Sequence, residues 1–271
     1  MRVEDWGERT GRLAAFGGTV SNRQATDGLL GRLAGEGLLE GAVCTGDLAA
    51  YCADPAGTVA AIRAAGVRTI AGNCERGLAE DSDGCGCGFE DGTACDRMSE
   101  AWWSHACAAT DDDAKAWMRD LPDVGVLRHE GAAVAVIHGG ATDIARFLWP
   151  CDPDAVFAEE IAALDDALGE PIGRVIAGHC GIAFTRDVRM GERTVKWINA
   201  GCAGMPPHDS RPETRFAVIE PDGMAVIHRL SYDHAAAAGE MRAAGLTQGY
   251  EGALETGLWP SEDVLPAELR R

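Results

Sequence analysis

The sequence is poor in positive charge, in aromatic residues and in long hydrophobic runs. It has 24 Lys and Arg against 43 Asp and Glu, a formal net charge of −19, and only 6% aromatic residues in 271 positions. This deficit of cations disfavours a broad electrostatic surface for DNA or RNA phosphates. The uncharged run 131–142 is well short of the roughly 18 apolar residues that a membrane-spanning helix needs. We therefore expect neither a nucleic-acid surface nor a membrane span.

We expect no export signal either. Glu4, Asp5 and Glu8 come before any apolar stretch, which is the wrong order for a secretory signal peptide. The 10 cysteines could indicate disulfides in a secreted chain, but a chain of this length with 46% hydrophobic residues can form a full core without them. We therefore expect a cytoplasmic protein with reduced thiols.

Short apolar runs alternate with segments of helical periodicity, the pattern of an α/β protein. Strands are predicted at 13–16, 42–45, 67–71, 128–137 as a hairpin, 174–177, 184–188, 194–198, 215–219 and 225–230. Helices are predicted at 24–33, 55–66, 96–121, 154–168 and in a C-terminal tail from about 233. A Cys- and Gly-rich segment at about 80–95 has no periodicity and is predicted to be an insertion loop. Because no repeat or low-complexity linker divides the chain, we expect one domain over 1–271.

Polar residues follow the predicted strands directly. The junctions are Gly17 to Asn22, Gly46-Asp47, Gly72-Asn73-Cys74-Glu75, His138-Gly139 and Gly178-His179-Cys180-Gly181. A single Gly-Asp pair is more often a turn, and a lone His at a strand end is usually a satisfied polar residue. Several such junctions are more informative than one, because the strand ends of an α/β sheet lie close together in space. Asp, Asn and two His supply the oxygen and nitrogen ligands that suit a divalent transition metal.

The order and spacing of these junctions resemble the calcineurin-like metallophosphoesterases over about 13–230. That family carries Asp-x-His, Gly-Asp, Gly-Asn-His, a His and Gly-His-x-His at successive strand ends, and 197–201 is similar to its late strand. The resemblance implies a four-layer αββα sandwich of two mixed sheets flanked by helices. It also implies metal ligation by Asp47, Asn73, His138 and His179.

Three positions depart from the family pattern. Gly18 and Val20 stand where the family has Asp-x-His, and Gly181 stands in place of the second His of the last motif, whereas Asn22 occupies the place of a family Asn. In the family the three altered positions hold the first of two metals. The resemblance thus implies a single remaining site for one divalent transition metal, with Mn, Fe and Zn as candidates.

Cys74 occupies the position of a family His that is assigned to protonation of the leaving group. A thiol with an ordinary pKa of about 8.5 can donate a proton but does not replace an imidazole near neutral pH. The resemblance implies a metal-dependent phosphatase or phosphodiesterase acting on a small phosphorylated molecule. The alternative is a catalytically inactive protein of the same fold that binds a ligand or has a regulatory role.

The cysteines form a second candidate constellation. Cys85, Cys87 and Cys95 lie in the predicted insertion and could hold zinc or iron or form a redox site, although Cys-x-Cys is not the usual knuckle spacing. The other interpretation is that they are small buried residues. The residues expected to line the catalytic edge are Gly18, Val20, Asn22, Cys180, Gly181, Cys202 and His208.

One further motif competes for His179 and Cys180. With Arg186 they match the His-Cys-x5-Arg spacing of cysteine-dependent phosphatases. That loop must lead into a helix whose N-terminus faces the phosphate. Because 184–198 has the pattern of a strand, a turn and a strand, we disfavour a cysteine-dependent mechanism.

Overall fold

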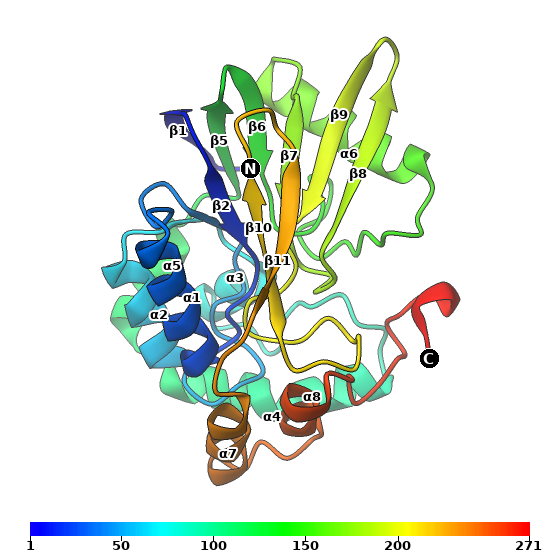
Figure 1. Ribbon diagram of the computed structural model, residues 1–271. Helices are drawn as coiled ribbons and strands as arrows, with labels where there is room; N and C mark the ends of the chain where they lie inside the picture. The colour runs from blue at the N-terminus through cyan, green and yellow to red at the C-terminus, as the bar shows by residue number, and fades with distance from the viewer.

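The computed structural model describes residues 1–271 as two mixed β-sheets packed face to face (Figure 1). The six-stranded sheet has the order β1 (Val3–Arg9), β5 (Val124–His129), β6 (Ala132–Val136), β7 (Arg174–Ala177), β9 (Arg193–Asn199) and β8 (Phe184–Met190). The five-stranded sheet has the order β11 (Ala225–Leu230), β10 (Thr214–Ile219), β2 (Leu13–Phe16), β3 (Val43–Cys44) and β4 (Arg68–Thr69). Strands β2, β3 and β4 run parallel, as do β6, β7 and β9.

The two sheets bury a common core. Alternate residues of a strand point to opposite faces, so Leu13 and Ala15 of β2 belong to the cluster between the sheets, whereas Ala14 and Phe16 belong to the cluster under the helices. The cluster between the sheets has 13 buried residues drawn from both. It fixes the two sheets together and brings their carboxyl-end loops to one edge.

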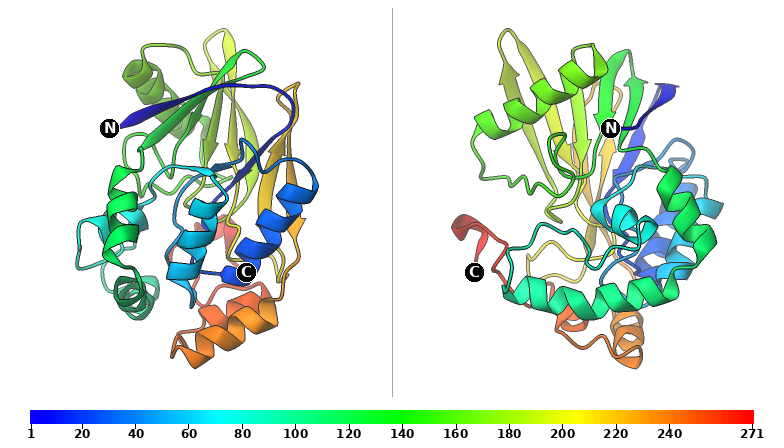
Figure 2. Two further views of the ribbon diagram at one scale, coloured as in Figure 1. Left: turned by 90° about the vertical axis from the view of Figure 1, so that its left-hand side faces the viewer. Right: turned by 180° about the vertical axis from the view of Figure 1, so that it is seen from behind.

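Helices cover the outer faces of both sheets (Figure 2). Helix α6 (Asp154–Leu168) packs on the six-stranded sheet, where the Phe157 and Trp197 rings lie 5.2 Å apart. The other helices are α1 (Arg23–Gly35), α2 (Pro55–Ala64), α3 (Asn73–Ala79), α4 (Ala94–Ala109), α5 (Asp112–Asp120), α7 (His234–Ala243) and α8 (Tyr250–Thr256). Residues of all seven enter the cluster on the five-stranded sheet. The predicted four-layer αββα arrangement is therefore confirmed.

Two elements differ from the sequence prediction. Strand β1 was not expected, because its sequence is charged and only Trp6 of its seven residues is buried. It is an edge strand that pairs in parallel with β5. The helix predicted at 96–121 is two helices, α4 and α5, because the Asp111 side chain accepts a hydrogen bond from the N–H of Ala114 and starts a new helix.

The chain beyond β11 folds back beneath the loop edge of the sheets (Figure 1). It contains α7, α8 and a short 3-10 helix, Ala267–Leu269. The Cys- and Gly-rich segment is irregular from 81 to 93, as predicted, and then enters α4. No helix combines the length and the apolar character needed to cross a membrane.

Candidate metal site and adjoining pocket

Three of the four predicted ligands meet at the loop edge of the sandwich. One ligand atom each of Asp47, His138 and His179 lies within 4.8 Å of the other two. Asp47 follows β3 of one sheet, whereas His138 and His179 follow the parallel strands β6 and β7 of the other. The packing of the two sheets is therefore what closes this site.

Four side-chain atoms that could bind a metal converge on one point. His138 Nε2 lies 3.0 Å from Asn73 Oδ1, 3.0 Å from His179 Nδ1 and 3.3 Å from Asp47 Oδ2. His138 Nδ1 lies 2.6 Å from the carbonyl oxygen of Thr45. A carbonyl only accepts, so Nδ1 carries the hydrogen; in the neutral ring the lone pair of Nε2 then faces the oxygens of Asp47 and Asn73 and one ring nitrogen of His179. A cation at this point relieves that repulsion, and a carbonyl behind the imidazole is the usual support of a metal-binding His.

The charges of these groups suit the binding of a metal. Burial opposes ionisation of Asp47, but His138 and His179 outweigh it and lower its pKa to about 2. Burial and the neighbouring His138 lower the pKa of His179 to about 3, and its Nε2 is buried without a hydrogen-bond partner. Burial alone would lower the pKa of His138, yet Asp47 raises it. At neutral pH the site therefore offers one carboxylate and an unprotonated His179.

The backbone at the site is held in costly conformations. Asp47 has φ 58° and His179 has φ 60°, both in the left-handed region that non-glycine residues rarely adopt. A side chain at Gly72 would overlap both Asp47 and His138, so only glycine allows this approach. Strained residues that the surrounding structure holds in place cluster at functional sites, and this strain supports a functional assignment.

Glu75 fixes the two loops that carry Asp47 and Asn73. Its carboxylate is fully buried and accepts hydrogen bonds from the N–H groups of Asp47 at 2.7 Å, Leu48 at 2.7 Å and Gly72 at 2.8 Å. Burial and the nearby Asp47 raise its pKa. This role was not predicted from the sequence, although Glu75 stands two positions after Asn73 in the same motif.

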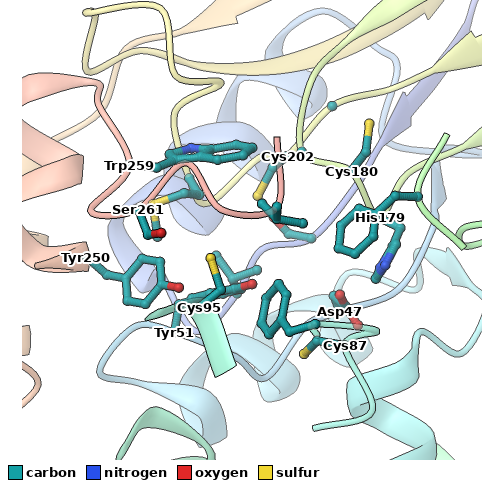
Figure 3. A pocket seen from close by; sticks show the side chains of 18 of the residues that line it. Asp47, Tyr51, Cys87, Cys95, His179, Cys180, Cys202, Tyr250, Trp259 and Ser261 are labelled. Atoms are coloured by element: carbon teal, nitrogen blue, oxygen red, sulfur yellow. The ribbon is translucent and has the colours of Figure 1, made fainter. Parts of the chain in front are cut away.

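A pocket opens beside the Asp47 and His179 end of the site (Figure 3). It encloses about 790 Å³ of space that is partly open to solvent. Five of the predicted lining residues do line it: Gly18, Val20, Cys180, Gly181 and Cys202. Its aromatic walls were not predicted from the sequence; they are Tyr51, Phe89, Phe147, Tyr250 and Trp259. These aromatic residues carry no motif, and only the fold brings them together.

Asn22 and His208 have other partners than a ligand in the pocket. The Asn22 side chain caps α1 by accepting from the N–H of Ala25, and it donates to the carbonyl of Gly204. His208 Nε2 lies 2.7 Å from Glu262 Oε1. Neither residue lines the pocket, which corrects the expectation for both.

Cys74 also lies outside the pocket. It sits in the first turn of α3 with no exposed surface, and its N–H donates to Asp47 Oδ1 at 3.2 Å. Burial, together with Asp47 and Glu75, raises the pKa of its thiol well above the usual value. A thiol that is buried and reluctant to ionise is poorly placed to exchange protons with a ligand, so the structure does not support Cys74 as a proton donor.

The positions that depart from the family pattern offer no ligand atoms. Gly18 and Gly181 have no side chain, and Val20 is apolar. The ring of Trp259 lies across Gly181, with its Cζ2 3.2 Å from the point that a Cβ at this position would occupy. An indole therefore fills the space beside the position where the family carries a second His.

The possible thiol cluster of Cys85, Cys87 and Cys95 is not present as three free thiols. Cys85 and Cys87 are joined by a disulfide, with their Cα atoms 5.3 Å apart. Cys95 is a separate, free and buried cysteine at the start of α4. The disulfide sulfurs are not thiolates and cannot serve as metal ligands. This pair also corrects the expectation that all thiols are reduced, whereas the other eight cysteines are free.

The His-Cys-x5-Arg motif lacks the helix that a cysteine-dependent phosphatase needs. The chain after Gly181 enters strand β8, which pairs antiparallel with β9. Burial raises the pKa of Cys180 to about 12. A protonated thiol followed by a strand cannot act as the nucleophile of that loop, so the prediction against this mechanism holds.

Several solved structures share the fold. A metallophosphoesterase from Sphaerobacter thermophilus matches 92% of this chain and 99% of its own, with a TM-score of 0.70 and 18% sequence identity. A hypothetical protein from Pyrococcus horikoshii OT3 matches the same shares with a TM-score of 0.73 and 15% identity. No protein-family model and no curated protein sequence matches the chain. At these identities the likeness shows the fold, which is metallophosphoesterase-like.

Proposed function

We propose that the protein is a metal-dependent phosphoesterase that binds one divalent transition metal through Asp47, Asn73, His138 and His179. The observation that carries the proposal is the convergence of Asp47 Oδ2, Asn73 Oδ1 and His179 Nδ1 on His138 Nε2 at 3.0 to 3.3 Å. A divalent cation at this point would contact all four atoms and offset the repulsion between the Nε2 lone pair and the two oxygens. The metal, when bound, lowers the pKa of a coordinated water and polarises a phosphoryl oxygen. Mn, Fe and Zn are the candidates, because the ligand set mixes imidazole with oxygen.

The chain itself supplies the orientation of the site. Thr45 fixes the ring of His138 through its carbonyl oxygen, and Glu75 fixes the backbone of Asp47. Phe147 packs against His179, with their ring centres 4.4 Å apart. Neighbouring residues thus fix the orientation of the side chains that would bind the metal. Such fixed side chains are the condition for binding a metal and a phosphoryl group in one geometry.

A non-catalytic binding protein is the second candidate. The observation that favours it is the lack of ligand atoms at Gly18, Val20 and Gly181, because these positions leave the chain without a second metal to share the developing charge. Both candidates bind the metal, and only the phosphoesterase turns over a substrate.

Metal analysis and a substrate screen test the proposal together. Protein purified without chelator is expected to contain about one transition metal per chain, and His179→Ala is expected to lower its affinity by at least about tenfold. His105→Ala is the matched control, because His105 contacts the carbonyl of Ala53 in another part of the molecule. Phosphatase and phosphodiesterase substrates are then assayed with Mn²⁺, Zn²⁺ or Fe²⁺ and with chelator.

Each result separates the candidates. Metal-dependent turnover that is lost in His179→Ala but kept in His105→Ala supports the phosphoesterase. Metal binding without turnover of any ester supports the binding protein. Two metals per chain, or none in any preparation, would contradict the proposed site.

A further inference from the structure

The pocket beside the metal site has almost no protein charge. None of its 19 lining residues is Lys or Arg, and its only carboxylate and imidazole side chains are those of Asp47, His138 and His179. A phosphomonoester dianion normally recruits Arg or Lys as well as a metal. Asp47 is the only carboxylate among the lining residues, so with one divalent cation the lining would carry a net charge of +1, which complements the single negative charge of a phosphodiester.

The same pocket concentrates aromatic side chains. Tyr51, Phe89, Phe147, Tyr250 and Trp259 are five of its 19 lining residues, in a chain with 6% aromatic residues. Figure 3 shows Trp259 and Tyr250 at the end opposite Asp47 and His179. A molecule with its phosphate at the metal ligands would therefore place its substituent among these rings.

Trp259 is held as a fixed wall. Its indole Nε1 donates to the carbonyl of Pro206 at 2.7 Å, and its backbone N–H donates to His208 Nδ1 at 2.8 Å. His208 is itself bonded to Glu262 through its other nitrogen. A ring that is already immobilised loses little conformational freedom when an aromatic group stacks on it. His208 is thus a positioning residue for Trp259.

From these features we infer that the pocket binds the aromatic substituent of a phosphodiester, with Trp259 and Tyr250 as its walls. The inference rests on the proposed phosphoesterase function and names its substrate class. The aromatic group lies next to Gly181, where Trp259 occupies the space beside a missing metal ligand. The chain therefore uses apolar contact at this position instead of a second cation.

The test compares two phosphodiesters of equal charge. Dissociation constants for diphenyl phosphate and dimethyl phosphate are measured by calorimetry with the full chain, both with Mn²⁺ and with chelator. Diphenyl phosphate is expected to bind at least about tenfold more tightly, and Trp259→Ala is expected to remove most of this preference. Trp117→Ala is the matched control, because Trp117 lies on α5 under Arg63, outside the pocket.

His208→Ala provides a second route to the same answer. It keeps the indole and its hydrogen bond to Pro206 but removes the acceptor for the backbone N–H of Trp259, so the preference for the phenyl ester is expected to fall while the affinity for dimethyl phosphate is kept. Trp259→Leu keeps an apolar side chain and serves if the alanine variant does not fold, as judged by circular dichroism. Bis(p-nitrophenyl) phosphate is expected to be turned over faster than p-nitrophenyl phosphate.

The outcomes distinguish this inference from the function on which it rests. Equal affinity for the two diesters, or a preference that survives Trp259→Ala and Trp259→Leu, overturns the aromatic pocket even if esters are hydrolysed. A preference that is lost in these variants supports the pocket. If that occurs without hydrolysis of any ester, the pocket stands as a binding site and the phosphoesterase proposal fails.

Discussion

Among single residues, Glu75 has the widest influence on the site without lining the pocket. It accepts three backbone hydrogen bonds, from Asp47, Leu48 and Gly72, and so joins two loops from neighbouring strands. Buried acceptors of this kind orient metal ligands, and their loss usually costs metal affinity rather than the fold.

Replacing Glu75 by Gln is expected to weaken metal binding by about 10–100-fold. The amide turns one acceptor into an NH₂ donor that faces N–H groups, so the free energy of unfolding is expected to fall by about 1–3 kcal/mol. Metal titration and urea denaturation measure the two effects. Glu80→Gln is the control, because Glu80 is exposed at the end of the same helix. Equal effects in both variants would contradict the role of Glu75.

At the scale of elements, the segment from 81 to 93 and the C-terminal segment complete the pocket from outside the sheets. The first contributes Cys87 and Phe89, and the second contributes Trp259, Ser261 and Val264. Neither is a helix or strand at these residues. Loops placed on a rigid scaffold commonly carry specificity in this way.

The disulfide in the segment from 81 to 93 can be tested by counting thiols. Alkylation of the denatured, unreduced protein is expected to modify the eight free cysteines, and reduction is expected to expose Cys85 and Cys87 in addition. Mass spectrometry gives the count. In Cys85→Ser the partner is released, so every remaining cysteine is expected to react without reduction. Alkylation of all ten in the unreduced protein would show that this pair is not oxidised.

For the whole molecule, the metal site links the two sheets. Asp47 follows a strand of one sheet, and His138 and His179 follow strands of the other. An ion that binds all three contacts only the folded chain. Binding to the native state alone raises the free energy of unfolding by mass action.

Metal is therefore expected to raise the melting temperature. At a free metal concentration 100 times the dissociation constant the gain is about 2.7 kcal/mol, and each kcal/mol shifts the melting temperature of a chain of this size by about 2–4 °C. Calorimetry with added Mn²⁺ and with chelator measures the shift. It is expected to fall by about half or more in His179→Ala, because tenfold weaker binding leaves about 1.4 kcal/mol at the same metal concentration, and to persist in full in His105→Ala. An equal shift in both variants would place the ion elsewhere.

The sequence by itself determined the strands and the polar residues at their ends. Leu13–Phe16, Arg174–Ala177 and Ala225–Leu230 are strands with the predicted bounds, because alternation and flanking turn residues are local signals. Asp47, His138 and His179 could be predicted for the same reason, since each directly follows such a strand. Residues that follow parallel strands lie at the same edge of the sheet, so residues far apart in the sequence lie close together in space.

Only the tertiary structure decided what surrounds those ligands. Trp259 and Phe147 reach the pocket from segments without a motif, Cys74 is buried, and His208 holds the C-terminal segment instead of a ligand. Periodicity and spacing report contacts within one element, whereas these contacts join residues far apart in the sequence. Their positions depend on how the helices and loops pack around the finished sandwich, and that packing is set by the whole core at once.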